Sequence, residues 1–253
     1  MSCRCRPEQV TAPSQIQGAA FALELGVDAL LLPADGAAIW EAAVECRRQR
    51  AARVSPADAG GTAGQGSAAA WATVTGVIDG GVGDRVCLDL IQVLSEGEGV
   101  LVGSSSKLLC LVHGETFVTD FVPARPFRVN AGPVHSYCLM ADGSTKYLCE
   151  VVAGDKVLVV SSAGKSRPVT VGRCKIERRP MVMARVAATT VFTGQVFLQQ
   201  AETVRLISPD AADTRGWRPL AVTEAAPGDL LLLRVTAQGT HVGRAIGAAV
   251  TEL

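Results

Sequence analysis

The chain has 253 residues, which is enough for one large domain or two modest ones with a sizeable core. Its 24 basic and 24 acidic residues balance, so the composition argues against nucleic acid or an anionic membrane as a partner. Apolar residues make up 48% of the chain, but their runs are far shorter than a bilayer span, and we expect a soluble globular protein.

Eight cysteines are spread along the chain, and no pair of them has the spacing of a zinc ribbon. No secretory signal precedes them, which favours free, mostly buried thiols in a reducing compartment. We therefore expect a cytoplasmic protein. The basic stretch from Met1 to Arg6 is also compatible with the end of a transit peptide, which would mean a plastid location if the source is a photosynthetic eukaryote.

Residues 1–53 have the pattern of a partial α/β region. Apolar residues at helical spacing predict a helix over Ile16–Leu25, with Gly26 as its cap. Val27–Leu32 predicts a short buried strand, and Ala37–Arg50 predicts a second helix whose last turn is rich in arginine. One unit of this kind cannot bury its own faces, so it either packs on the later part of the chain or belongs with a preceding portion.

Residues 54–69 are rich in Gly, Ala and Ser and are interpreted as a linker. From 70 to 253, short strands rich in Val, Leu and Ile alternate with turn residues, so the predicted fold class is α+β and mainly β. Gly-Asp pairs precede predicted strands at Gly83-Asp84, Gly154-Asp155 and Gly228-Asp229. This weak repeat favours two or three related β-barrel or β-roll units, although Gly-Asp is also a common turn on its own.

The segment from Val171 to Pro180 alternates between two faces. One face would carry three cations and one carboxylate: Arg173, Lys175, Glu177 and Arg179. Such a set can hold a carboxylate substrate, tune the lysine or orient Glu177 as a base. A solvated outer face with a cross-strand ion pair explains the same pattern. Pro180 is expected to end the strand at a pocket rim or a sheet edge.

The segment Arg125–His135 holds a second polar group. Arg125 and Arg128 are spaced to grip an anion, and Asn130 can orient a carbonyl or hydroxyl group. A turn is predicted at Gly132-Pro133. A histidine just beyond such a turn suits an acid, a base or a metal ligand, and it also suits a purely structural role.

Two further polar groups give weaker signals. Ser104 and Ser105 belong to a serine-rich turn that can present hydroxyls and backbone N–H groups to a ligand. His113 and Glu115 share a strand face two residues apart, which is a workable spacing for a hard or borderline metal, and Glu98 could join them. A buried histidine hydrogen-bonded to a glutamate is the alternative interpretation.

From about Ala72 to the C-terminus, long ordered blocks of the chain resemble the 3-dehydroquinate synthase II family. The blocks are VGDRVC (Val82–Cys87), GEGVLVGS (Gly97–Ser104), LVH (Leu111–His113), RPFRVNAGPVH (Arg125–His135) and VGRCKIERRP (Val171–Pro180). The stretch ALELGVD (Ala22–Asp28) also resembles the end of the family's N-terminal α/β region. The resemblance implies that most of that region is missing from this chain.

The resemblance implies a reaction in aromatic amino acid biosynthesis, on the shikimate pathway. It is the NAD-dependent oxidative deamination and cyclisation of 2-amino-3,7-dideoxy-D-threo-hept-6-ulosonate to 3-dehydroquinate. For that chemistry we expect Lys175, Glu177 and His135 to transfer protons. The substrate would be bound by the remaining polar residues, with its carboxylate anchored by one of the arginines: Arg125, Arg128, Arg179, Asn130, Ser104 and Ser105.

Two other interpretations stay open. Related enzymes that make aminohydroxybenzoates use a divalent metal such as manganese, and the candidate ligands would then be His113, Glu115 and His135. A truncated, non-catalytic relative that binds a small molecule is the third interpretation. A homo-oligomer is compatible with all of them.

Overall fold

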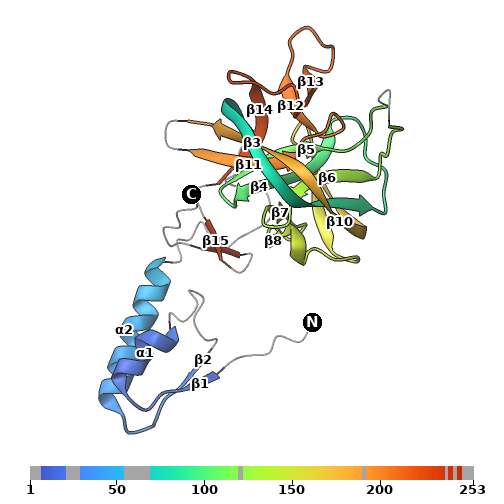
Figure 1. The fold of residues 1–253 in the computed structure, drawn as a ribbon. Helices are drawn as coiled ribbons and strands as arrows, with labels where there is room; N and C mark the ends of the chain where they lie inside the picture. The colour runs from blue at the N-terminus through green and yellow to red at the C-terminus, as the bar shows by residue number, and fades with distance from the viewer. Residues whose placement is uncertain are drawn as a thin grey trace. The chain divides into compact units, whose positions relative to one another are not determined.

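A computed structural model describes residues 7–20, 29–53, 69–118, 122–189, 192–236, 239–241 and 244–246. The chain divides into two compact units, residues 1–62 and 63–253 (Figure 1). Each unit has its own hydrophobic core. The predicted linker lies outside the described residues except for residue 69. Within the described part of the chain, no helix is long and apolar enough to cross a lipid bilayer.

The first unit combines two helices with a two-stranded parallel sheet. Its elements are β1 (Pro7–Gln9), α1 (Pro13–Ala20), β2 (Ala29–Leu31) and α2 (Ala37–Arg53). The helices contribute Ile16, Ile39 and Cys46 to a small core. A helix and a strand lie where the sequence predicted them, and α2 confirms the second helix. α1 begins earlier than predicted, because proline fits the first turn of a helix, and residues 21–25 of the predicted helix lie outside the described residues. The prediction that the strand is buried is wrong, because Leu31 of β2 is 57% exposed. The predicted cap at Gly26 lies outside the described residues.

The second unit is built from strands, which confirms the mainly β prediction. The strands are β3 (Ala69–Leu90), β4 (Glu98–Ser105), β5 (Leu108–His113), β6 (Arg128–Pro133), β7 (Tyr137–Leu139), β8 (Thr145–Tyr147), β9 (Lys156–Ser161), β10 (Ser166–Ala187), β11 (Thr193–Gln199), β12 (Arg205–Pro209), β13 (Trp217–Ala221) and β14 (Leu230–Val235). A 3-10 turn, η1 (Leu148–Glu150), follows β8. β15 (Gly239–His241) and β16 (Arg244–Ile246) form a separate two-stranded sheet.

Two strands of 22 residues, β3 and β10, organise the main sheet and run antiparallel along each other (Figure 1). The hydrogen-bonded pairings form a ring, from β3 to β10, β9, β4, β5, β14 and back to β3. β6 pairs with the second half of β3, and β11 pairs with the second half of β10. The finer division into barrel or roll units stays a prediction.

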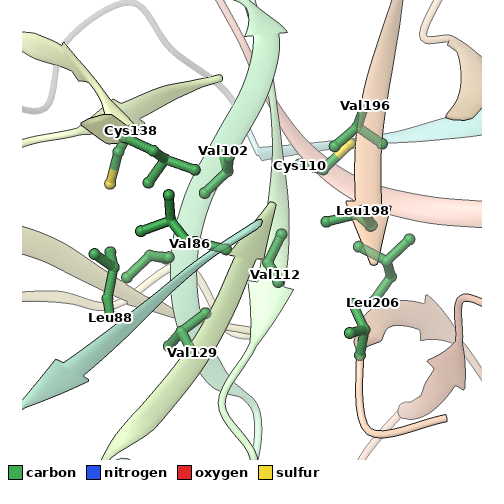
Figure 2. Packing of buried hydrophobic residues seen from close by; sticks show 14 of the residues in the cluster. Val86, Leu88, Val102, Cys110, Val112, Val129, Cys138, Val196, Leu198 and Leu206 are labelled. Atoms are coloured by element: carbon green, nitrogen blue, oxygen red, sulfur yellow. The ribbon is translucent and has the colours of Figure 1, made fainter. Parts of the chain in front are cut away.

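The core of the second unit fills the space between these strands. Figure 2 shows valine, leucine and cysteine side chains from several strands pointing toward one another: Val86, Leu88, Val102, Cys110, Val112, Val129, Cys138, Val196, Leu198 and Leu206. Each of them is at most 1% exposed. Because side chains alternate along a strand, the neighbours of Val86 and Leu88 on β3 and of Val129 on β6 face the other way. The polar residues of interest lie on that other face.

The turns before β9 and β14 are built alike, as the predicted repeat requires. In Gly154-Asp155 and Gly228-Asp229, the aspartate side chain accepts the backbone N–H of the residue three before it, at 2.9 and 2.8 Å. Both glycines have positive φ, 95° and 100°. The prediction is wrong for Gly83-Asp84, which lies inside β3 and pairs with β10.

β10 continues through Pro180, where the sequence predicted its end. The register with β3 shifts there, because Pro180 pairs with Val82 while Val182 pairs with Asp79. Gly81, in the skipped stretch, has a φ of 71°. This bulge lets a residue without an N–H sit inside a long paired strand.

Candidate functional site

Three adjacent strands, β6, β3 and β10, present polar side chains on one face of the sheet. Residues directly opposite in antiparallel strands point to the same side. Read across the strands, the facing rows are Arg128–Asp89–Arg173 and Asn130–Cys87–Lys175, with Arg85 opposite Glu177. Together with Arg179, these residues are called the polar face.

Glu177 is bound by three cations of this face. Its Oε2 accepts a hydrogen bond from Arg85 Nη2 at 2.5 Å and forms an ion pair with Arg179 Nη2 at 3.3 Å. Its Oε1 is 3.0 Å from Lys175 Nζ. The hydrogen bond from Lys175 is the main cause that lowers the pKa of Glu177, and the charges of Arg179 and Arg85 lower it further. Glu177 is therefore a carboxylate at neutral pH. These four residues are called the Glu177 cluster.

Asp89 forms a second junction on the polar face. Arg128 grips it with two hydrogen bonds, of 2.7 Å to Oδ1 and 2.9 Å to Oδ2, and Arg173 donates two more to Oδ2. Burial alone would raise the pKa of Asp89, but the hydrogen bonds from the two arginines outweigh it and lower the pKa. Arg128 is thus bound to a carboxylate of the protein itself.

Glu115 and Arg125 close the edge of the polar face beside Arg128. Arg125 Nη1 lies 3.3 Å from Glu115 Oε2, and the backbone N–H of Glu115 donates to the carbonyl of Arg128 at 2.8 Å. Burial raises the pKa of Glu115 despite the hydrogen bond from Arg125. Cys87, in the middle of the face, is fully buried and contacts the Arg85 guanidinium, and burial raises the pKa of its thiol.

Two buried polar atoms of the polar face have no hydrogen-bond partner among the described residues. They are Arg85 Nε and Asn130 Oδ1. The other end of Asn130 is satisfied, because its Nδ2 donates to Gln199 Oε1 of β11 at 2.9 Å. Unsatisfied buried polar groups are rare in folded proteins, and functional sites are one place where they occur.

His135 contacts Ser104 and Phe197 and not the residues of the Glu177 cluster. The turn predicted at Gly132-Pro133 instead follows these residues, because β6 continues through Pro133, and His135 lies in that turn. Ser104 Oγ is 3.4 Å from His135 Nε2. Its ring meets Phe197 edge-on, with the centroids 5.6 Å apart. Partial burial lowers its pKa, so the imidazole is neutral at pH 7. Ser105, which follows Ser104 in the chain, accepts a hydrogen bond from the backbone N–H of Lys107 with its Oγ.

His113 and Glu115 do not form the predicted metal pair. His113 is 1% exposed, its Nε2 accepts the N–H of Gly97 at 2.7 Å, and its Nδ1 donates to the carbonyl of Gly114 at 2.6 Å. Both ring nitrogens are therefore occupied by the backbone, while Glu115 pairs with Arg125. Among the residues described, no group of three or more His, Cys, Asp or Glu could hold a metal ion. As placed in the described part of the chain, His113 and Glu115 therefore do not fit a manganese site.

The polar face with its Glu115–Arg125 edge carries more positive than negative charge. In the described part of the chain, its ion pairs join six cations to three carboxylates, which leaves an excess of three positive charges. The excess is largest at Glu177, where three cations meet one carboxylate. Because the whole chain is neutral, this excess is local, and it suits an anionic ligand.

Sequence reasoning missed Arg85, Asp89 and Gln199. A signal for the first two is present, because Arg85, Cys87 and Asp89 alternate with Val86, Leu88 and Leu90, which is the pattern of a strand with one buried apolar face. The pattern is easily overlooked because Gly83-Asp84, just before it, resembles a turn. Gln199 has no comparable signal, since its role depends on which strand lies beside β6.

The chain is similar to enzymes of known name. Residues 71–253 match the family model of the 3-dehydroquinate synthase II C-terminal domain. A protein named 3-dehydroquinate synthase from Methanospirillum hungatei is 44% identical over 71% of this chain and 53% of its own length. One of the same name from Methanocaldococcus jannaschii is 45% identical over 72% of this chain and 48% of its own length. No solved structure matches the chain significantly.

The match also reaches the first unit. A protein named 3-dehydroquinate synthase from Korarchaeum cryptofilum is 41% identical over 91% of this chain and 63% of its own length, and a match of 231 residues cannot fit within the second unit alone. The chain spans about half the length of most of the curated relatives it matches.

Proposed function

The chain belongs to the 3-dehydroquinate synthase II family, and from this premise we propose that it takes part in the reaction implied by that resemblance. In that reaction the aminoheptulosonate substrate is oxidatively deaminated with NAD and cyclised to 3-dehydroquinate. We assign to this chain the binding of the substrate carboxylate and the transfer of protons. The relatives' names support the overall reaction, and the polar face supports the assignment.

The observation that carries the proposal is the Glu177 cluster. Its net positive charge is partly accessible, because the side chains of Lys175 and Arg179 are 45% and 42% exposed. A substrate carboxylate can bind between these cations while Lys175 stays in contact with Glu177. Of the three arginines considered as the anchor, Arg179 is favoured. Arg128 is only 12% exposed and already grips Asp89 with its Nε and Nη2 atoms.

The same geometry suggests how protons move. Glu177 has a lowered pKa, so it is a weak base and serves to hold the ammonium group of Lys175 in place. The oriented ammonium can stabilise the enolate that closes the ring and give a proton to the alkoxide that forms. His135, neutral at pH 7, can take the proton released as the amine becomes an imine.

NAD would accept the hydride that leaves the amine-bearing carbon. The positive charge of the polar face suits the negative diphosphate of a dinucleotide. Arg173, which is 65% exposed, adds an accessible cation beyond the Glu177 cluster. We assign the diphosphate of the cofactor to Arg173. The rest of the cofactor site is left open, since the curated relatives are about twice as long as the part matched.

The test is turnover by the purified chain with the aminoheptulosonate and NAD, read as NADH absorbance and a dehydroquinate product. Lys175→Ala is expected to lower kcat by at least about a hundredfold, the usual contribution of a positioned acid or base. Lys146→Ala is the matched control, because Lys146 is 36% exposed and pairs with Asp155 away from the polar face. Equal rates for both variants would contradict the assignment.

Wild-type protein that neither turns over nor produces NADH would contradict the proposal for this chain by itself. A substrate-dependent rise in melting temperature without turnover would then favour the binding-module interpretation. The manganese-dependent alternative has no observation in its favour, because His113 and Glu115 are committed to other partners.

A further inference from the structure

Arg85 is a buried cation of the polar face, on the strand beside Glu177 and Lys175. Its side chain is 7% exposed, compared with 26% for Glu177, and it lies opposite Glu177 in the register of β3 and β10. One end of its guanidinium, Nη2, binds Glu177, and the other, Nη1, contacts Cys87 on its own strand. The side chain is therefore held at both ends.

The contacts of Glu177 divide cleanly between its two oxygens. Oε2 binds the two arginines, Arg85 at 2.5 Å and Arg179 at 3.3 Å, and Oε1 binds Lys175 at 3.0 Å. Arg85 has the shortest of these contacts and is the only buried cation among the three. An exposed ion pair such as that of Arg179 fixes a side chain weakly, whereas a short, partly buried one such as that of Arg85 fixes it more firmly.

We propose that Arg85 is a positioning residue for the Glu177–Lys175 pair. It holds Oε2 from the neighbouring strand, which turns Oε1 toward the ammonium group of Lys175 and keeps it there during the reaction. The proposal rests on the proposed function, in which Lys175 transfers a proton, and it gives Arg85 the role of keeping Lys175 in position for that transfer. Arg85 itself touches no substrate atom in this scheme, since its side chain is only 7% exposed.

A buried arginine is a costly way to build a sheet, which is why a role beyond packing is reasonable. Replacing a buried ion pair by apolar residues of similar size is often neutral or even stabilising. The unpartnered Nε of Arg85 adds to this cost. A residue retained only for stability would be better replaced by a hydrophobic one, whereas a residue that orients Glu177 needs the fork of an arginine, whose two ends bind Glu177 and contact Cys87 at once.

The proposal predicts a loss in kcat and not in substrate binding. In Arg85→Met, the Glu177 carboxylate is free to turn toward solvent or Arg179, so Lys175 is no longer held in the reacting geometry. We expect kcat to fall by about tenfold or more while KM changes by less than about threefold. Arg85→Lys keeps the charge without the fork and should recover part of the loss. Arg167→Met is the matched control, because Arg167 also grips a carboxylate, that of Glu98, away from the polar face.

A second readout is independent of turnover. The pKa of Glu177, followed by carboxyl NMR and assigned with Glu177→Gln, should rise in Arg85→Met and not in Arg167→Met. An unchanged Glu177 titration, or a loss that appears in KM alone, would overturn the proposal. If Arg85→Met does not fold, Arg85→Lys carries the same test. If the wild type has no activity the proposed function fails, while the titration still decides whether Arg85 controls Glu177.

Discussion

Arg85, Asp89 and Glu115 show how charged side chains are kept inside this sheet. Each is at most 8% exposed, and each finds its counter-ion on a different strand or loop: Glu177 for Arg85, Arg128 for Asp89, and Arg125 for Glu115. A buried charge of this kind is stable only with a partner in place. The polar face therefore depends on the register of its three strands, and a change in one member is felt by the others.

His113 and His135, the two histidines that the sequence suggested as functional, lie in different environments. His135 lies at an exposed turn with a serine beside it, while His113 is enclosed between the rings of Phe117 and Trp217, with centroid distances of 5.3 and 5.7 Å. Burial is the main cause that lowers the pKa of His113 to about 4, and the charges of Arg205 and Arg215 add to it. Sequence identified both residues, but it could not separate them, because burial depends on distant strands.

His113 should make the protein sensitive to mild acid. Its pKa is about 4 when folded and about 6.5 when unfolded, so the unfolded chain binds more protons between these values. The contribution of neutral His113 to the free energy of unfolding is fully present above about pH 6.5. It falls by about 3 kcal/mol as the pH drops toward 4. Urea unfolding at a series of pH values measures this slope.

His113→Phe should remove that slope while lowering stability at pH 7. Phenylalanine can stack between the same rings, but it leaves the buried N–H of Gly97 without an acceptor, at a cost of about 1–3 kcal/mol. His135→Phe is the control: it removes only the contribution of His135, whose pKa is also lowered, and should keep the part of the slope that comes from His113. A slope that survives in His113→Phe would assign it to other groups.

At the scale of elements, glycines set how closely strands approach. A Cβ on Gly99 of β4 would overlap the carbonyl oxygen of Val112 and lie 2.7 Å from its carbonyl carbon, and both are backbone atoms of β5. Gly103 meets the carbonyl of Leu108 in the same way. β4 and β5 are both in the ring of pairings, so a side chain at either position would force two of its members apart.

Gly99→Ala is therefore expected to lower the free energy of unfolding by about 3 kcal/mol or more, because backbone cannot move aside as a flexible side chain can. Gly76→Ala in β3 is the control: a Cβ there meets nothing within 4 Å, and its effect should stay within about 0.5 kcal/mol. Chemical denaturation of the two variants compares them directly. Equal stabilities would mean that β4 and β5 can separate without loss.

The length of β3 and β10 was the main feature that the sequence did not predict. Alternation over 171–179 correctly indicated the faces of β10, and the composition correctly indicated a mainly β unit. Gly83-Asp84 and Pro180 look like breaks in a strand, yet both lie inside paired strands. They are tolerated because the register shifts at Pro180, and a bulge depends on the partner strand as much as on the local residues. Local sequence signals alone cannot predict it.

At the scale of the whole molecule, charge and hydrophobic core are distributed differently. The charges of the chain balance overall, but the polar face keeps an excess of positive charge, which net composition could not indicate. The apolar residues instead gather in separate cores, one in residues 1–62 and two in residues 63–253. The polar face lies entirely within the second unit, so its geometry depends on the cores of that unit.

Separate cores predict separate unfolding. The second unit contains the complete ring of pairings and all of the residues in its own cores, between Ala72 and Leu233, so it should fold without residues 1–62. Calorimetry of the chain with those residues removed should show the main transition within about 2 °C of its position in the full chain. A truncated chain that fails to fold, or melts much lower, would mean that the first unit completes the second.

A point variant tests the same idea without shortening the chain. Ile16 is fully buried in the core of the first unit, and Ile16→Ala should weaken that unit by about 2–5 kcal/mol. If the cores are independent, the main transition keeps its temperature and only a smaller transition moves. A matching shift of the main transition would show that the two units unfold together, and the polar face would then depend on residues far from its own strands.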